Sequence, residues 1–345
     1  AQAILAQALD RYRPMARRAM LRPALCACLC THAAGLVPHP RASQKLLRSA
    51  YVYGPDVKCG RDSVVTVTTV DSNFGDMFEN WLHFAAPFLR AQKGASLLAI
   101  PEDPGAMSLL LALRKRSPFP FDVLELGGPQ GLYRALDNPT SGYNSSEYGA
   151  VVRRRPRHLL QLLQLGCTVM YVDIDTVWRK SPFDRIAEAG RKYEMYVTSD
   201  LPGKWGYTCT CFLYLRPTNN VIYLLEAWDR NLRNHPTERL NQPRFNDALS
   251  LYVKRMNVST LKSTDFPPGG EEYAALWDNA TVVHANWMRG KSTKIDFLRH
   301  RGLWFEPESN STAKSKSTAA SNFMAASRST AAGNATAAGN ATAAG

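Results

Sequence analysis

The chain has 345 residues, a length typical of one large domain or two small ones. Hydrophobic residues make up 45% of it and aromatic residues 10%, which is enough for a sizeable core. The net charge is +13, but aromatic interleaving, zinc-ligand spacing and a Gly-rich RNA motif are all missing, so we expect no nucleic-acid partner and favour an anionic small substrate.

Residues 1–60 show no clear periodicity, and we predict that they form a poorly ordered leader and stem. An apolar patch at 24–37 follows a basic flank and is shorter than the ~20 residues that a membrane span needs. It fits a signal-peptide core better than a span, so the N-terminus is interpreted as a cleaved signal or a membrane anchor. Residues 307–345 are rich in Ser, Thr, Ala, Gly and Asn, which predicts a disordered tail.

Glycosylation motifs indicate the compartment. Six asparagines begin Asn-x-Ser/Thr motifs: Asn144, Asn257, Asn279, Asn310, Asn334 and Asn340. One such motif arises easily by chance, but six favour the secretory lumen. The seven cysteines form no CxxC pair and no Cys/His array with zinc spacing.

Residues 61–306 alternate predicted strands with predicted helices. We predict strands over 63–70, 95–100, 121–126, 167–178, 194–199, 208–215 and 281–284. We predict helices over 74–88, 104–114, 159–163, 218–234 and 294–300, with two more beginning near residues 182 and 241. This alternation predicts a doubly wound α/β domain with a parallel sheet.

The stretch 167–178 organises the domain. It is apolar and rich in β-branched residues, and it carries Asp173 and Asp175, whose side chains share one face of an extended segment. Ligands of open α/β sheets gather at the carboxyl ends of the strands, so both acids are predicted to face one ligand. A hard divalent cation that also carries substrate phosphates suits such a pair. A solvated surface turn is disfavoured because the preceding strand is so apolar.

Two enzyme classes place Asp-x-Asp at the end of a strand. In a haloacid-dehalogenase-type phosphatase the first Asp is the nucleophile and the second the acid/base. In a metal-dependent glycosyltransferase the pair holds a nucleotide-sugar diphosphate through a metal. The local string does not separate these two classes. The phosphatase is disfavoured because several predicted elements precede the acids and the downstream acids are isolated.

In the glycosyltransferase interpretation, His284 ends a predicted strand and completes a metal site with Asp173 and Asp175. Gly290 lets the backbone approach phosphate, and Lys291 at a helix start holds diphosphate charge. His284 taken alone is more typical of a hydrogen-bonded core histidine than of a metal ligand. Its combination with Gly290, Lys291 and the two acids favours the metal site.

Three further residues are candidates for donor contacts. Arg155 is a candidate diphosphate contact, with a solvated basic face as the alternative. Thr69 and Asp71 end the first predicted strand and are placed to contact the nucleoside. A helix cap is an equally good interpretation of Asp71.

Several stretches, taken together and in order, resemble glycosyltransferase family 77, a group of nucleotide-diphospho-sugar transferases. They lie at 151–160, 165–178 (including Tyr-Val-Asp-Ile-Asp-Thr-Val-Trp), 181–183, 208–218, 241–246 (Asn-Gln-Pro-Arg-Phe-Asn), 283–287 (Val-His-Ala-Asn-Trp) and 302–304. With the first strand, the resemblance covers about residues 62–305.

The resemblance implies one GT-A catalytic domain over 61–306, with a mostly parallel sheet flanked by helices. It implies a UDP-sugar donor, a Mn²⁺ (or Mg²⁺) cofactor and retention of anomeric configuration. It also implies a type II membrane protein of the plant or algal Golgi lumen. Such an enzyme would transfer xylose, arabinose or galactose to a cell-wall glycan or glycoprotein acceptor.

By the same analogy, Gln242 lies under the anomeric carbon and Asp200 contacts a sugar hydroxyl. The chain has Cys211 where the family often has Gly, and Asn241 where it often has Asp. The first change narrows the space beside the sugar, and the second removes an acid near it. An altered donor choice, or a non-catalytic relative that binds glycan or nucleotide, therefore stays open.

Overall fold

The structure is a computed structural model that describes residues 57, 59–60, 62–124, 146–201, 207–288 and 290–306. The predicted tail, nearly all of the predicted leader and stem, and four of the six glycosylation motifs lie outside the described residues. Among the described helices, none is long and apolar enough to cross a bilayer.

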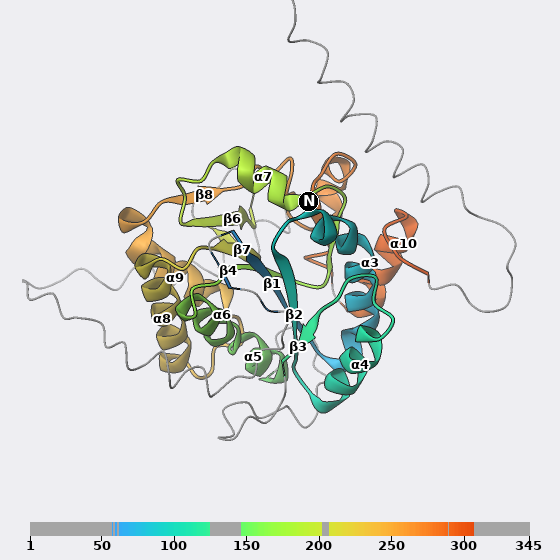
Figure 1. Ribbon diagram of the computed structural model, residues 1–345, viewed down its shortest axis with the longest axis horizontal. Coiled ribbons are helices and arrows are strands. Elements are labelled where there is room, and N and C mark those ends of the chain that lie inside the picture. Colours follow the sequence, from blue (N-terminus) through green and yellow to red (C-terminus); the bar gives the residue numbers. More distant parts are fainter. Residues whose placement is uncertain are drawn as a thin grey trace, which may run out of the picture. The chain divides into compact units, whose positions relative to one another are not determined.

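A seven-stranded sheet forms the centre of the domain, in the order β3-β2-β1-β4-β7-β6-β8 (Figure 1). Its strands are β1 (Val64–Val70), β2 (Ala95–Pro101), β3 (Asp122–Val123), β4 (Thr168–Val172), β6 (Met195–Ser199), β7 (Thr208–Leu215) and β8 (Val258–Thr260). β7 is antiparallel to both β4 and β6, and every other pairing is parallel. The mostly parallel α/β sheet is confirmed, but the expectation of a wholly parallel sheet is wrong at β7.

Helices cover both faces of this sheet (Figure 1). One hydrophobic cluster joins a sheet face to α3 (Gly75–Ala91), α4 (Pro104–Arg114), α7 (Pro182–Ala189) and α10 (Lys291–His300). The other cluster joins the opposite face to α6 (Arg155–Gln164), α8 (Asn219–Asn234) and α9 (Gln242–Tyr252). The remaining helical elements are α5 (Ser146–Val152), η2 (Ser72–Phe74), η3 (Val253–Arg255) and η4 (Glu271–Leu276).

Side-chain caps explain why several helices begin where the sequence predicts. Asp103 accepts a hydrogen bond from the backbone of α4, Ser181 from α7 and Thr218 from α8. Each cap satisfies a backbone N–H that the helix itself leaves unpaired, and it contributes about 1 kcal/mol.

The predicted strand 167–178 is two strands separated by a turn. β4 ends at Val172, and β5 (Thr176–Trp178) leaves the large sheet to pair with β9 (Val282–His284). The Thr176 backbone N–H and hydroxyl both donate to the carbonyl of Asp173, at 3.2 and 2.8 Å, and they close the turn. The two acids therefore meet through a turn, and the expectation of one extended segment is wrong. Because Thr176 pairs with His284, the same turn also brings the histidine alongside.

Two disulfides stabilise the domain, although the sequence pattern gave no pairing. Cys59–Cys167 links the segment before β1 to the residue before β4, across 108 positions of sequence. Cys209–Cys211 lies within β7.

Candidate active site

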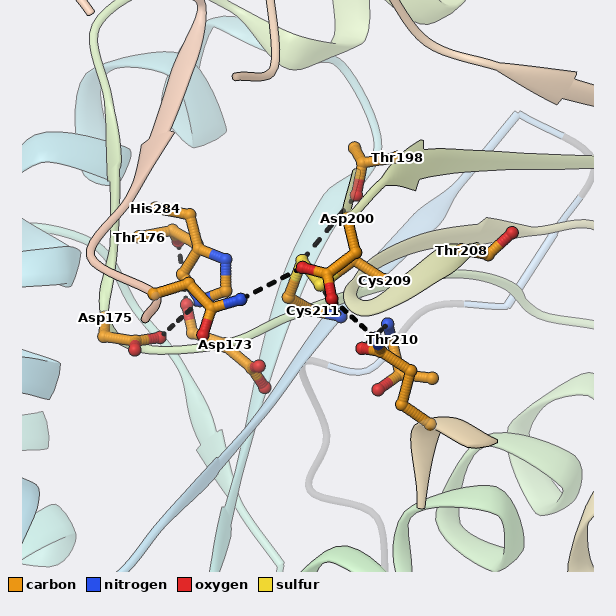
Figure 2. Close-up of a disulfide and its surroundings, with 12 residues drawn as sticks. Asp173, Asp175, Thr176, Thr198, Asp200, Thr208, Cys209, Thr210, Cys211 and His284 are labelled. Carbon is orange, nitrogen blue, oxygen red and sulfur yellow. Dashed lines mark hydrogen bonds and ion pairs between the residues drawn. A yellow bond between two sulfur atoms is a disulfide. The ribbon is translucent and has the colours of Figure 1, made fainter. Parts of the chain in front are cut away.

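Asp173, Asp175 and His284 form one group at the carboxyl end of β4 (Figure 2). One ligand atom from each lies within 4.8 Å of the other two. His284 is buried, and Asp173 and Asp175 are both half-buried. A backbone hydrogen bond of 2.9 Å from Ala285 N to the Asp175 carbonyl holds the end of β9 against the turn. The structure thus brings together the three residues chosen from sequence as metal ligands.

Asp175 has two nitrogen partners, one on each carboxylate oxygen. His284 Nε2 lies 3.1 Å from its Oδ1, and Lys294 Nζ lies 2.5 Å from its Oδ2. Burial alone would raise the pKa of Asp175, but the charges of Lys294 and His284 lower it well below its usual range. Burial alone would lower the pKa of His284, but Asp175 reverses this and raises it. Lys294 was not selected from the sequence. Its position one helical turn after Lys291 in α10 could have indicated that it also faces the site.

Asp173 is held by a different set of donors. An Arg155 guanidinium nitrogen lies 2.9 Å from Asp173 Oδ1, and the Tyr171 hydroxyl donates to the same oxygen at 2.7 Å. Arg155 also donates to the Thr210 carbonyl, and its guanidinium lies 4.2 Å from the centre of the Tyr171 ring. At 6% exposed, Arg155 belongs to no solvated basic face. It lies behind the acid pair, and its contact with a diphosphate stays a prediction.

The donor set of this group fits a hard or borderline divalent cation. Two carboxylates and one imidazole are ligands that Mn²⁺ accepts, and Mg²⁺ accepts the oxygens. The Lys294 ammonium pairs with Asp175 Oδ2, so this carboxylate oxygen already binds a positive charge in the structure.

Asp200 and Gln242 form a second polar group beside the first. Gln242 Nε2 donates to Asp200 Oδ2 at 2.8 Å, and Asn286 Nδ2 donates to Oδ1 at 3.2 Å. Burial raises the pKa of Asp200. Gly269 permits this arrangement, because a Cβ there would lie 2.5 Å from the backbone of Asn286. Asp200 and His284 line one cavity, so one member of each group borders the same space.

The candidate nucleoside contacts lie at the end of β1. Asp71 accepts a hydrogen bond of 2.9 Å from the Asn73 backbone, so it caps η2, as its alternative interpretation predicts. Burial raises the pKa of Asp71 to about 6. The Thr69 hydroxyl lies 3.5 Å from the Tyr171 hydroxyl, which connects β1 to the support of Asp173.

The two residues expected to hold diphosphate lie at the start of α10. Lys291 pairs with Asp76 of α3 at 2.7 Å, rather than with the acid pair. Gly290 has φ +86°, and a Cβ there would meet no atom within 4 Å. Glycine suits this position because its backbone is left-handed, and not because a side chain would clash with a neighbour.

The two departures from the family pattern have separate structural roles. Cys211 is joined to Cys209 and lines the same cavity as Asp200. Asn241 is buried and donates to the Val152 carbonyl at 3.1 Å, so it ties the start of α9 to the end of α5.

The basic cluster at 153–157 makes contacts within the protein. Arg153 donates to carbonyls near the end of α8, including that of Glu238 at 3.0 Å, and Arg157 pairs with Asp229 at 2.9 Å. Together with Arg155, these side chains join α6 to its neighbours.

Comparisons with known proteins agree on one family. The sequence model described as "Nucleotide-diphospho-sugar transferase" matches residues 122–298. The Arabidopsis thaliana UDP-D-xylose:L-fucose alpha-1,3-D-xylosyltransferase is 28% identical over 304 residues, which cover 79% of this chain and 77% of that protein. The enzyme numbered 1 with the same name, also from Arabidopsis thaliana, is 29% identical over 273 residues, or 71% of each protein.

Solved structures include a glycosyltransferase involved in the glycosylation of the major capsid of PBCV-1. It aligns with a TM-score of 0.45 and 10% identity, over 69% of this chain and 99% of that one.

Proposed function

The chain belongs to the nucleotide-diphospho-sugar transferase family, and on that premise we propose that it is a retaining, metal-dependent glycosyltransferase. It moves a sugar from a UDP-sugar donor to a glycan or glycoprotein acceptor. The observation that carries this proposal is the group of Asp173, Asp175 and His284, beside the separate polar pair of Asp200 and Gln242. Family membership sets the phosphatase interpretation aside.

Xylose is the donor sugar that we propose first, ahead of arabinose and galactose. Its support is that both Arabidopsis relatives are named as UDP-D-xylose:L-fucose xylosyltransferases. Cys211 stands where the family often has a glycine, and with Cys209 it forms part of the cavity wall. Its side chain leaves less room beside the donor sugar, which favours a small sugar.

Asp173, Asp175 and His284 would hold Mn²⁺ or Mg²⁺. When bound, the cation would act as a Lewis acid toward the leaving UDP. Arg155 pairs with Asp173 and Lys294 pairs with Asp175, so the two acids are held close together before any cation binds. The two acids therefore lie side by side with a cationic partner each, which offsets the repulsion between two neighbouring carboxylates.

Asp200 and Gln242 would orient the sugar. The Gln242 and Asn286 amides fix both Asp200 oxygens, so the carboxylate is a rigid acceptor for a sugar hydroxyl. Gln242 would lie under the anomeric carbon, where Thr210 N and Asp200 fix the two ends of its amide. We propose front-face displacement, in which the departing phosphate takes the proton of the acceptor hydroxyl.

We place the enzyme in the Golgi lumen, as a type II membrane protein of the secretory pathway. Two observations support an oxidising, glycosylating compartment. The domain contains two disulfides, and Asn257 and Asn279, the two described motif asparagines, are both exposed.

UDP-sugar hydrolysis tests the proposal. The full chain is incubated with UDP-xylose, UDP-arabinose or UDP-galactose, with Mn²⁺ or with EDTA. We expect UDP release with Mn²⁺, fastest from UDP-xylose, and loss of release with EDTA. Binding of UDP-sugar without any turnover would favour a non-catalytic relative. Cleavage of p-nitrophenyl phosphate with Mg²⁺ would instead revive the phosphatase.

A further inference from the structure

Cys209 and Cys211 form a pair of sulfur atoms that the proposed transfer reaction does not use. They occupy alternate positions on β7, so both side chains point to the same face of the sheet. Both are buried, and both line the cavity that also contains Asp200 and His284 (Figure 2). Their sulfurs and a nitrogen of His284 lie within 4.8 Å of one another.

The chemistry of this second group differs from that of the acid pair. Two cysteine sulfurs and one imidazole form a soft donor set that prefers Zn²⁺ to Mn²⁺ or Mg²⁺. Three protein ligands leave one position open to water from the cavity. In the disulfide neither sulfur is a thiolate, so the set is incomplete while the bond is closed.

We propose that reduction of Cys209–Cys211 opens a Zn²⁺ site formed by Cys209, Cys211 and His284. When Zn²⁺ occupies this site, it prevents Mn²⁺ or Mg²⁺ from binding at Asp173, Asp175 and His284. The existence of the Zn²⁺ site rests only on the three side chains. Its effect on donor binding rests on the proposed function.

The redox step balances with a dithiol as the reductant. One dithiol thiolate attacks one sulfur of the pair, the S–S bond breaks, the partner cysteine leaves as a thiolate, and a mixed disulfide forms. The second dithiol thiolate then attacks the dithiol sulfur of this mixed disulfide, which releases the remaining cysteine as a thiolate and leaves a cyclic disulfide; both thiolates take up protons. The protein gains two electrons and two protons, and Zn²⁺ binding later releases the two thiol protons to water.

The strand holds the sulfurs in place after the bond opens. β7 lies inside the sheet, with ladders to β4 on one side and β6 on the other. The Cys211 backbone N–H also donates to Cys209 Sγ at 3.3 Å, and the Cys211 carbonyl accepts from Asp173 N at 2.9 Å. Both Cα positions are therefore fixed by backbone pairing.

His284 is the link between the two sites. A neutral imidazole has one acceptor nitrogen, so it ligates one cation at a time. With the disulfide closed, His284 is available to Asp173 and Asp175. With Zn²⁺ on the thiolates, the acid pair loses its nitrogen ligand.

The test measures thiol protection at each cysteine of the full chain. The protein is reduced with dithiothreitol, freed of reductant without oxygen, and alkylated with iodoacetamide with or without Zn²⁺. Peptide mass spectrometry reads each cysteine separately. We expect Zn²⁺ to slow alkylation of Cys209 and Cys211 roughly tenfold or more, because bound thiolates are withdrawn from reaction.

Two variants assign the ligands. In His284→Ala we expect the protection by a limiting Zn²⁺ concentration to disappear, whereas in Asp173→Asn we expect it to remain. Unchanged alkylation with Zn²⁺ in the wild type would overturn the site, as would full protection in His284→Ala. Thermal unfolding of the reduced protein is measured alongside, and loss of its cooperative transition on reduction also contradicts the proposal.

A second measurement tests the exclusion. Mn²⁺-dependent UDP binding by the reduced protein should fall when Zn²⁺ is added, and a Cys209→Ser/Cys211→Ser variant should resist this. If Zn²⁺ protects the thiols but UDP binding does not change, the Zn²⁺ site is supported, and the claim that it prevents Mn²⁺ binding at the acids is wrong. If the wild type never binds UDP with Mn²⁺, the proposed function fails, and the protection experiment still decides the site.

Discussion

Gln242 donates a 2.8 Å hydrogen bond to Asp200, although the two residues lie 42 positions apart on different elements. Gln242 begins α9, and Asp200 follows β6. Asp200 lines the same cavity as His284, but neither Asp200 nor Gln242 belongs to the group of Asp173, Asp175 and His284. The site thus has two parts that substitutions can separate.

Asp175→Asn should abolish transfer and metal-dependent UDP binding together. The neutral amide removes a metal ligand and leaves Lys294 without its partner. A loss of several kcal/mol of charge stabilisation corresponds to a decrease in kcat/KM on the order of 100-fold or more. Kinetics and UDP titration with Mn²⁺ measure both effects. Asp184→Asn, at an exposed position on α7, is the matched control, and unchanged turnover in Asp175→Asn would remove the acid pair from the mechanism.

Gln242→Ala should lower kcat while metal-dependent UDP binding stays intact. The substitution removes one amide from Asp200 but touches neither acid of the metal group. We expect a decrease in kcat of roughly 10- to 100-fold, the scale for misplacing a group that positions substrate. Separate measurement of kcat and of UDP affinity checks this. An equal loss of UDP affinity would place Gln242 in the nucleotide part of the site instead.

Lys294→Gln should raise Mn²⁺ affinity in the absence of nucleotide. The ammonium competes with the metal for Asp175 Oδ2, and a like charge so close disfavours the cation. Isothermal titration with Mn²⁺ measures the change, for which we expect roughly a tenfold increase. Lys291→Gln is the control, because Lys291 pairs with Asp76 and should leave this affinity unchanged. A weaker Mn²⁺ site in Lys294→Gln contradicts the prediction.

Asp71→Asn should stabilise the protein at neutral pH. The pKa of Asp71 is 3.8 as a free group and about 6 in the fold, so the folded state binds its proton more tightly. Stability from this residue is therefore greatest below about pH 4 and decreases as pH rises toward 6. Asparagine keeps the cap without the charge, so the gain at pH 7.5 is about 2 kcal/mol after allowance for partial exposure, and it vanishes near pH 4. Urea unfolding at both pH values is the measurement, with Asp71→Ser as a second uncharged cap.

Asn257→Gln and Asn279→Gln should each remove one glycan from protein made in a secretory host. Both asparagines are exposed and begin glycosylation motifs, so an oligosaccharyltransferase can modify both. Mass spectrometry before and after peptide-N-glycosidase treatment counts the glycans. Absence of modification at both positions would weigh against the secretory lumen.

The sequence was sufficient for elements with strong local signals. β1 and β7 are apolar and β-branched or aromatic, and their predicted bounds match the structure to within a residue. Helices with a capping residue or an early proline were equally clear. β8 was missed because Val258–Thr260 is short and only partly buried. The reversed direction of β7 has no local signal at all, because it depends on how the chain returns between β6 and α8.

The site shows the same division between local and distant information. The two acids and His284 were visible because each follows an apolar run. Lys294 and the Arg155–Asp173 pair were not, because they depend on contacts 119 and 18 positions away. The disulfide partners were also beyond the sequence, since spacing alone does not fix connectivity.

The position of the Cys59–Cys167 bond has a consequence for the strand that carries the acids. It secures the chain immediately before β1 and at the entrance to β4, which are the amino ends of two parallel strands. The acids lie at the other end of β4. The bond therefore holds β1 and β4 together at the edge of the sheet opposite the acids, so it fixes the strand that carries them without occupying their edge.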